Sequence, residues 1–87
     1  MKPTKTKDLN YYLSLRYQIL LTPEDEGWSA ALPDLPGCMA AGDTIAETLE
    51  LLEDARRSWI EASLTQGLDV PEPGSHALNA SGLDRAA

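Results

Sequence analysis

Residues 11–22 alternate between apolar and polar positions, and this alternation is the most regular pattern in the chain. Apolar side chains occupy every odd position from Tyr11 to Leu21, and the even positions are mainly polar, with Leu20 as the strongly apolar exception. A period of two places successive side chains on opposite faces of a strand. The pattern therefore predicts one long strand over 11–22 with one buried face.

The segment 23–27 interrupts this alternation with a proline, three consecutive acidic residues and a glycine, a composition typical of a hairpin turn. Alternation resumes at Trp28, Ala30 and Leu32, which predicts a second strand. A short third strand is expected over 39–41, after a loop rich in proline and glycine.

A longer period begins at Thr44. Thr44 and Glu47 have the spacing of a capping box, in which each side chain bonds to the backbone N–H of the other residue. Apolar residues then recur at spacings of three, four or seven, which predicts one helix of about six turns. The stripe comprises Ile45, Leu49, Leu52, Trp59 and Ser63, flanked by Leu51, Ala55 and Ala62. Gly67 is the expected stop, and Pro71 and Pro73 prevent the helix from resuming.

The order strand, strand, short strand, long helix predicts one α+β domain, a three-stranded antiparallel sheet packed by one long helix. The chain divides into a mobile basic arm at 1–10, the domain at 11–73 and a short tail at 74–87. Two readings of the tail remain open, a short fourth strand over 76–80 or loose chain. Because a sheet this small has poorly covered edges, we expect a dimer or a tetramer.

The chain has 87 residues and a net charge of −7, and its acidity follows the lysine-rich start. From Asp8 onward there are four basic and fourteen acidic residues, a net charge of −10. Such a body repels phosphate backbones, which argues against unaided binding of nucleic acid, and it attracts a basic partner. Acidity that only aids solubility is the open alternative.

Groups capable of catalysis are few. Cys38 is the only thiol and His76 the only imidazole, and nothing in the sequence brings them together as a nucleophilic pair requires. Gly37 and Gly42 do not form a phosphate-binding loop, because no lysine follows them. A single cysteine, the absence of a secretory signal and the absence of a long apolar run indicate a cytoplasmic protein that does not enter membranes.

Metal binding has little support. The sequence contains neither a C-x-x-C motif nor paired histidines, which argues against a zinc site. Magnesium held by Glu24, Asp34 and Asp43 would be the route to a nuclease, but carboxylates in turns are mostly hydrated. We therefore expect no enzymatic activity, no metal and no cofactor.

The residues best suited to bind a partner lie around the hairpin turn. Glu24, Asp25 and Glu26 place three carboxylates together, where Lys or Arg of a partner could meet them. Trp28 follows closely, and Asp34 completes the predicted set. The alternatives are a hydrated turn and a tryptophan that belongs to the core.

The segment 33–44 joins the two hydrophobic periods and contains two prolines, two glycines and Cys38. Each proline fixes its own φ, and each glycine permits backbone angles that other residues avoid. We interpret this segment and the helix start as structural. The residues concerned are Pro33, Asp34, Pro36, Gly37, Cys38, Gly42, Asp43, Thr44 and Glu47.

The run from Trp28 to Cys38, W-S-A-A-L-P-D-L-P-G-C, is followed by G-D-T-I-A-E at 42–47, and together they resemble the HicB family of antitoxin-like proteins. The helix exit G-L-D-V-P-E-P at 67–73 is similar as well, so that the resemblance covers roughly residues 15–73. The resemblance implies a partial RNase H-like fold without nuclease activity.

The resemblance also implies a function, which is to bind and neutralise a small basic HicA-type ribonuclease toxin of a type II toxin–antitoxin system. Typical HicB antitoxins continue into a C-terminal DNA-binding domain, and residues 74–87 are too short for one, so no direct DNA binding is expected. A stand-alone oligomeric scaffold or small-ligand-binding domain without a toxin partner is the alternative, and residual nuclease activity is a third hypothesis.

Overall fold

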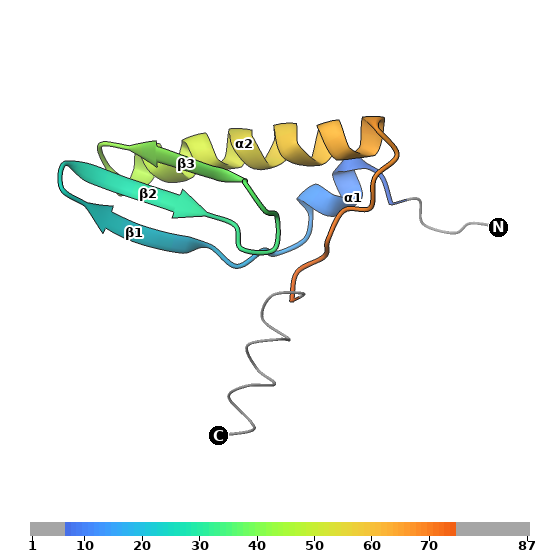
Figure 1. Cartoon of the computed structure of the whole chain (residues 1–87), viewed down its shortest axis with the longest axis horizontal. Coiled ribbons are helices and arrows are strands. Elements are labelled where there is room, and N and C mark those ends of the chain that lie inside the picture. Colours follow the sequence, from blue (N-terminus) through green and yellow to red (C-terminus); the bar gives the residue numbers. More distant parts are fainter. Residues whose placement is uncertain (1–6, 75–87) are drawn as a thin grey trace, which may run out of the picture.

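The computed structural model describes residues 7–74, which form a three-stranded antiparallel sheet with one long helix on it and a short helix beside that helix (Figure 1). The elements in chain order are α1 (Leu9–Leu13), β1 (Leu20–Glu24), β2 (Gly27–Ala31), β3 (Met39–Gly42) and α2 (Ile45–Thr65). This confirms the α+β class, the three antiparallel strands and the single long helix. The possible strand over 76–80, which includes His76, lies outside the described residues.

The prediction of a strand from residue 11 is wrong, because α1 ends at Leu13 and β1 begins only at Leu20. Asp8 starts α1, within the segment predicted as an arm, and its carboxylate accepts a hydrogen bond of 3.0 Å from the Tyr11 N–H. The even-numbered Tyr12 is buried, which a strand with odd positions inward would not allow.

The irregular segment between α1 and β1 is held by α2 rather than by a neighbouring strand. Arg56 of α2 donates hydrogen bonds to the carbonyl oxygens of Leu13 and Leu15, at 3.4 and 3.3 Å. These carbonyl groups therefore find their partner in a side chain that is distant in sequence, a contact that the local alternation does not reveal.

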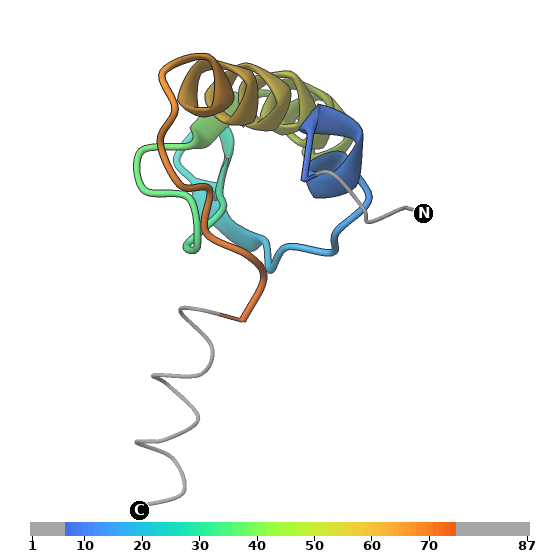
Figure 2. The ribbon, with the colours of Figure 1, turned by 90° about the vertical axis from the view of Figure 1, so that its right-hand side faces the viewer.

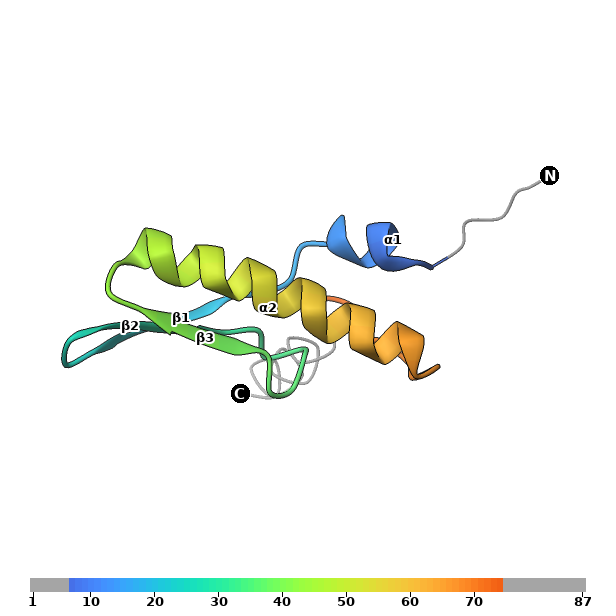
Figure 3. The same cartoon turned by 90° about the horizontal axis from the view of Figure 1, so that it is seen from above.

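The sheet has the order β1-β2-β3, and a two-residue turn at Asp25 and Glu26 joins the first two strands. In the register, Leu20 pairs with Ala31, which in turn pairs with Met39. Figures 2 and 3 show α2 on one side of the sheet, where it packs on β2 and β3. No other element of residues 7–74 covers the opposite side (Figure 3).

The core lies between the sheet, the two helices and the loop after β2. Its buried apolar residues are Tyr12, Tyr17, Ala30, Leu32, Leu35, Cys38, Leu52, Ile60 and Val70. The predicted helical stripe is partly wrong, because Ile45 and Leu49 are 40% and 37% exposed. Thr48 is fully buried beside them, and its hydroxyl donates a 2.6 Å hydrogen bond to the Thr44 carbonyl oxygen, so that burial leaves this polar group paired.

The predicted end of α2 at Gly67 is confirmed. The N–H groups of Gly67 and Leu68 donate to the carbonyl oxygens of Leu64 and Ser63, at 3.1 and 2.9 Å. Gly67 has a φ of +74°, which glycine adopts without steric cost. This is a Schellman motif, which turns the chain sharply away from the helix axis.

Residues 68–74, called here the strap, run from the end of α2 back across the molecule (Figure 1). The Tyr17 hydroxyl donates to the Pro71 carbonyl oxygen at 2.6 Å, and the Gly74 N–H donates to the Asp34 carboxylate at 3.2 Å. The strap thereby joins α2 to the segment before β1 and to the loop after β2. Within residues 7–74, no helix has the length and apolar character that crossing a membrane requires.

Candidate partner-binding site

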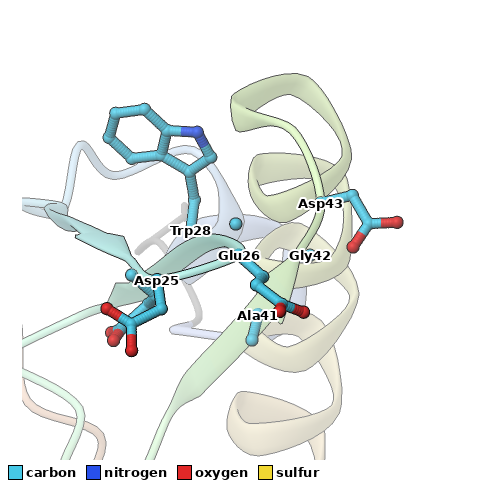
Figure 4. Close-up of a pocket in the computed structure, with 8 residues that line it drawn as sticks. Asp25, Glu26, Trp28, Ala41, Gly42 and Asp43 are labelled. Atoms are coloured by element: carbon cyan, nitrogen blue, oxygen red, sulfur yellow. The ribbon is translucent and has the colours of Figure 1, made fainter.

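An open hollow of about 620 Å³ lies where the turn between β1 and β2 meets the end of β3 and the start of α2 (Figure 4). Every charged residue in its lining is acidic. The lining residues are Glu24, Asp25, Glu26, Gly27, Trp28, Ala41, Gly42 and Asp43. This acidic hollow therefore combines the predicted hairpin residues with residues from a different part of the chain.

The hairpin has three carboxylates, of which two lie in its exposed turn and the third is hydrogen-bonded within the sheet. Asp25 and Glu26 form the exposed turn, and Figure 4 shows the Glu26 side chain on the side toward Asp43. The Glu24 carboxylate accepts a hydrogen bond of 2.7 Å from the Ser29 hydroxyl on the neighbouring strand. Asp25, Glu26 and Asp43 are therefore the carboxylates best placed to meet a cation from outside.

Gly27 allows the hairpin and the end of β3 to approach each other closely. A Cβ atom at this position would lie 2.4 Å from the carbonyl oxygen of Gly42, a distance that real side chains do not adopt. Its φ of +154° is also one that other residues rarely adopt. The two sides of the acidic hollow meet because this residue has no side chain.

Gly42 plays the corresponding role between β3 and α2. A Cβ atom there would lie 2.9 Å from Thr48 Oγ1 and 3.1 Å from both the Thr48 backbone nitrogen and Glu47 Cγ. The first turn of α2 therefore packs directly on the strand backbone, which fixes the position of Asp43 between them.

The capping box is confirmed in one half and shifted in the other. The Thr44 Oγ1 accepts a 3.0 Å hydrogen bond from the Glu47 N–H, as predicted, but the Glu47 carboxylate accepts from the Asp43 N–H at 2.9 Å instead of from Thr44. The carboxylates of Asp43 and Glu47 lie at the positive end of the helix dipole, which stabilises them there. The Asp43 side chain stays exposed at the rim of the hollow.

Trp28 lines the hollow, and it is only partly exposed. It lies opposite Gly42 in the register, at the end of the sheet nearest the start of α2. Figure 4 shows the indole directed away from the Asp25 side chain. The ring therefore forms one wall of the hollow rather than lying over the carboxylates.

Asp34 lies apart from the other predicted residues. It is only 4% exposed, in the loop after β2, and its carboxylate accepts the hydrogen bond from Gly74 of the strap. Asp34 is therefore not part of the acidic hollow. Asp43 was not among the partner-binding residues predicted from the sequence. The short connection between β3 and the start of α2 could have indicated it, because this connection places Asp43 at the same end of the sheet as the hairpin.

The loop that contains Asp34 has a structural role. The Leu32 N–H donates to the Cys38 carbonyl oxygen at 3.0 Å, and the Cys38 N–H donates to the Leu35 carbonyl oxygen at 2.9 Å. The Trp59 indole N–H donates to the Pro36 carbonyl oxygen at 2.8 Å, which anchors the loop to α2. These bonds satisfy backbone groups that leave the sheet.

The described residues offer little that resembles a catalytic centre. Cys38 is buried, and its burial raises the pKa of the thiol, which disfavours the reactive thiolate. Within residues 7–74, no three His, Cys, Asp or Glu side chains are grouped so that they could hold a metal ion. The carboxylates of the acidic hollow are suited to bind cationic groups.

The chain is similar to one family of known proteins. Residues 17–82 match the family described as HicB-like antitoxin of bacterial toxin–antitoxin system. The protein UPF0150 ssl0259 of Synechocystis is 38% identical over 58 residues, which cover 66% of this chain and 80% of that protein. UPF0150 Ta0767 of Thermoplasma acidophilum is 26% identical over 65 residues, which cover 74% of this chain and 94% of that protein.

Antitoxin HicB 1 of Photorhabdus laumondii is 34% identical over 62 residues, which cover 70% of this chain. The matched region is only 40% of that antitoxin. The similarity to this antitoxin therefore spans less than half of its length.

Proposed function

This chain belongs to the family of HicB-like antitoxins of bacterial toxin–antitoxin systems, and from that premise we propose that it binds and neutralises a small basic HicA-type ribonuclease toxin without being a catalyst itself. The observation that carries the proposal is the acidic hollow. Asp25 and Glu26 from the hairpin and Asp43 from the start of α2 converge on one end of the domain, and no basic residue lines the hollow.

Charge supports this assignment of the surface. The chain carries a net charge of −7, so a basic partner is attracted over a long range and steered toward it. Within about one Debye length, roughly 8 Å at physiological salt, the local cluster of carboxylates decides where that partner docks. Lys or Arg side chains of the toxin would enter the hollow and lie between the hairpin and Asp43.

We further infer that the sheet and α2 correspond to a partial RNase H-like fold that does not cleave RNA. The order of three antiparallel strands followed by a long helix supports this assignment. The carboxylates of the hollow lie on an exposed rim rather than in a closed metal-binding group, which supports a binding role over hydrolysis. The longer antitoxin relatives extend beyond the matched region, and DNA binding forms no part of this proposal.

The test takes the product of the gene adjacent to that of this chain and measures binding and rescue. We expect co-purification of the two proteins and relief of the toxicity of that protein on co-expression. The double variant Asp25→Lys/Glu26→Lys should lower the association rate constant at least about tenfold and reduce its dependence on salt. Rates are measured by stopped-flow or surface plasmon resonance at several salt concentrations.

The matched control is Glu50→Lys/Glu61→Lys, which changes the net charge equally on exposed positions of α2. It should slow association much less, because neither residue lines the hollow. Equal slowing by both double variants would show that only net charge matters and would remove the hollow from the interface. No binding and no rescue by the wild-type chain would overturn the proposed function and would favour a stand-alone scaffold.

A further inference from the structure

We propose that a second hollow, between α2 and the segment that leads into β1, receives one aliphatic side chain of the basic toxin, which is thereby held by an apolar anchor as well as by the acidic hollow. This side hollow has a volume of about 120 Å³. Its apolar lining comes from the segment before β1, from the loop after β2 and from α2, and consists of Tyr17, Ile19, Leu32, Leu49 and Leu52. The inference rests on the function proposed above and adds a second part to the same partner-binding surface.

The side hollow exists because the helices cover only part of the sheet. α2 packs on β2 and β3, and neither α1 nor α2 contacts β1, which is the strand farthest from α2 (Figure 1). Leu21 of β1 pairs with the buried Ala30, so its side chain lies on the side of the sheet that carries α2. The two walls of the side hollow are therefore open to a partner, and Ile19 and Leu49 are 48% and 37% exposed there.

The volume and the lining of the side hollow indicate what fits it. The volume of about 120 Å³ equals that of roughly four water molecules at ~30 Å³ each, whereas pockets for small ligands measure about 300–1,000 Å³. The Tyr17 hydroxyl already donates to Pro71, and the Arg56 guanidinium already donates to two backbone carbonyl oxygens and to Glu53. The lining therefore offers little to orient a polar ligand, and it suits one aliphatic side chain.

Apolar side chains connect the side hollow to the acidic hollow. Ile19 directly before β1, and Leu21 and Pro23 within it, lie on the same side of the sheet, and Pro23 pairs with Trp28, which forms one wall of the acidic hollow. The five residues of β1 separate the two hollows by about 17 Å, at roughly 3.4 Å per residue. A partner that fills both hollows therefore presents an aliphatic side chain at about this distance from a Lys or Arg side chain.

Charge selects a basic protein over a second copy of this chain as the occupant. The apolar connection leads to the acidic hollow, in which every charged lining residue is acidic. A second copy would bring a net charge of −7 toward these carboxylates, whereas a basic protein would place Lys or Arg beside them. An apolar centre with a charged border is also the usual composition of a protein–protein interface.

Leu49→Gln tests the side hollow without a change of charge. We expect it to raise the dissociation rate constant of the toxin complex at least about tenfold, because an amide replaces part of the apolar wall, and to leave the association rate constant unchanged. Ile19→Gln, on the opposite wall, should act in the same way. The matched control is Leu51→Gln, since Leu51 is on the same helix and is 42% exposed but does not line the side hollow. Circular dichroism shows whether each variant is folded.

Surface plasmon resonance separates this inference from the proposed function. Asp25→Lys/Glu26→Lys acts on association through charge, whereas Leu49→Gln acts on dissociation through apolar contact. If Leu49→Gln and Ile19→Gln accelerate dissociation no more than Leu51→Gln does, the side hollow is not an anchor site, and the proposed function is unaffected. A wild-type chain that binds no toxin would overturn both.

Thiol labelling provides a second readout and identifies the occupant. The new thiol of Leu49→Cys should react with a maleimide at least about tenfold more slowly in the toxin complex than in the chain alone, whereas that of Leu51→Cys should react equally in both. Cys38 is buried and is common to the two variants. Protection that grows with the concentration of the chain alone would indicate a second copy. Protection of the chain alone at every concentration would indicate another part of the same chain, and either result would overturn the proposal.

Discussion

The Tyr17 hydroxyl donates a hydrogen bond of 2.6 Å to the carbonyl oxygen of Pro71, across 54 positions of the chain. The bond ties the segment before β1 to the strap after α2. Tyr17 is only 8% exposed, so the hydroxyl group depends on this partner rather than on water. The strap is thus part of the folded domain, and its attachment can be tested.

Tyr17→Phe should lower the free energy of unfolding by about 1 kcal/mol, because it leaves the Pro71 carbonyl oxygen without this donor. Chemical denaturation of wild type and variant measures the difference. Tyr11→Phe gives the comparison: Tyr11 is more exposed and donates to the Glu72 side chain of the strap, so the loss of its hydroxyl should cost less. If Tyr17→Phe were as stable as wild type, the strap would not depend on this bond.

The same tyrosine predicts a loss of stability at alkaline pH. Burial raises the pKa of Tyr17 to about 12, above its ordinary value of 10.0. The folded state therefore holds this proton more tightly than the unfolded state, so the stabilisation is complete below pH 10.0 and is lost as the pH rises toward about 12. The free energy of unfolding, measured by denaturation at a series of pH values across this range, should fall more steeply with pH for wild type than for Tyr17→Phe. An equal dependence on pH for the two proteins would contradict the prediction.

An ion pair at the strap predicts the opposite dependence at acidic pH. The hydrogen bond from Lys7, at 3.0 Å, and then that from Tyr11 lower the pKa of Glu72 below its ordinary value of 4.5. The folded state therefore binds this proton less tightly, so its stabilisation is present above pH 4.5 and is lost as the pH falls through the lowered pKa. This stabilisation is small because the side chains of Lys7 and Glu72 are both exposed to solvent.

Glu72→Gln tests whether this stabilisation is lost as the pH falls. The variant should be slightly less stable than wild type at neutral pH and equal to it in acid, where Glu72 of the wild type is protonated. Unfolding midpoints measured across the acidic range give the comparison. A difference that persists unchanged in acid would mean that the carboxylate charge contributes nothing.

The sequence predicted those parts of the fold that depend on neighbouring residues. Thr44 and Gly67 mark the two ends of α2, because capping and a positive φ act within one turn of the chain. The hairpin at 23–27 was predicted for the same reason. The strand predicted from residue 11 was not correct. The Asp8 cap that begins α1 is a local signal that the regular alternation concealed, whereas the hydrogen bonds from Arg56 to this segment depend on the three-dimensional structure.

The candidate site was predictable to a similar extent. Glu24, Asp25, Glu26 and Trp28 are adjacent in sequence, and the acidic hollow keeps them together. Asp43 joins them only through the register that places Gly42 beside Trp28. Asp34 has the same chemistry as these residues, but its carboxylate is buried against the strap, and burial is a property that composition does not reveal.

Gly42→Ala tests whether the contact between β3 and α2 positions the acidic hollow. The added Cβ atom would lie 2.9 Å from Thr48 Oγ1 and 3.1 Å from the backbone nitrogen of the same residue, so α2 or the strand must shift. We expect the free energy of unfolding to fall by about 1–3 kcal/mol, the usual cost of overpacking.

The control for this variant is Ser58→Ala, an exposed substitution on α2 that should change stability by less than about 0.5 kcal/mol. Chemical denaturation measures both variants, and toxin binding is then measured on the folded fraction. Because the shift separates Asp43 from the hairpin, Gly42→Ala should also weaken binding, whereas Ser58→Ala should not. A Gly42→Ala protein as stable as wild type would show that the helix start yields easily and does not hold the two sides of the hollow in place.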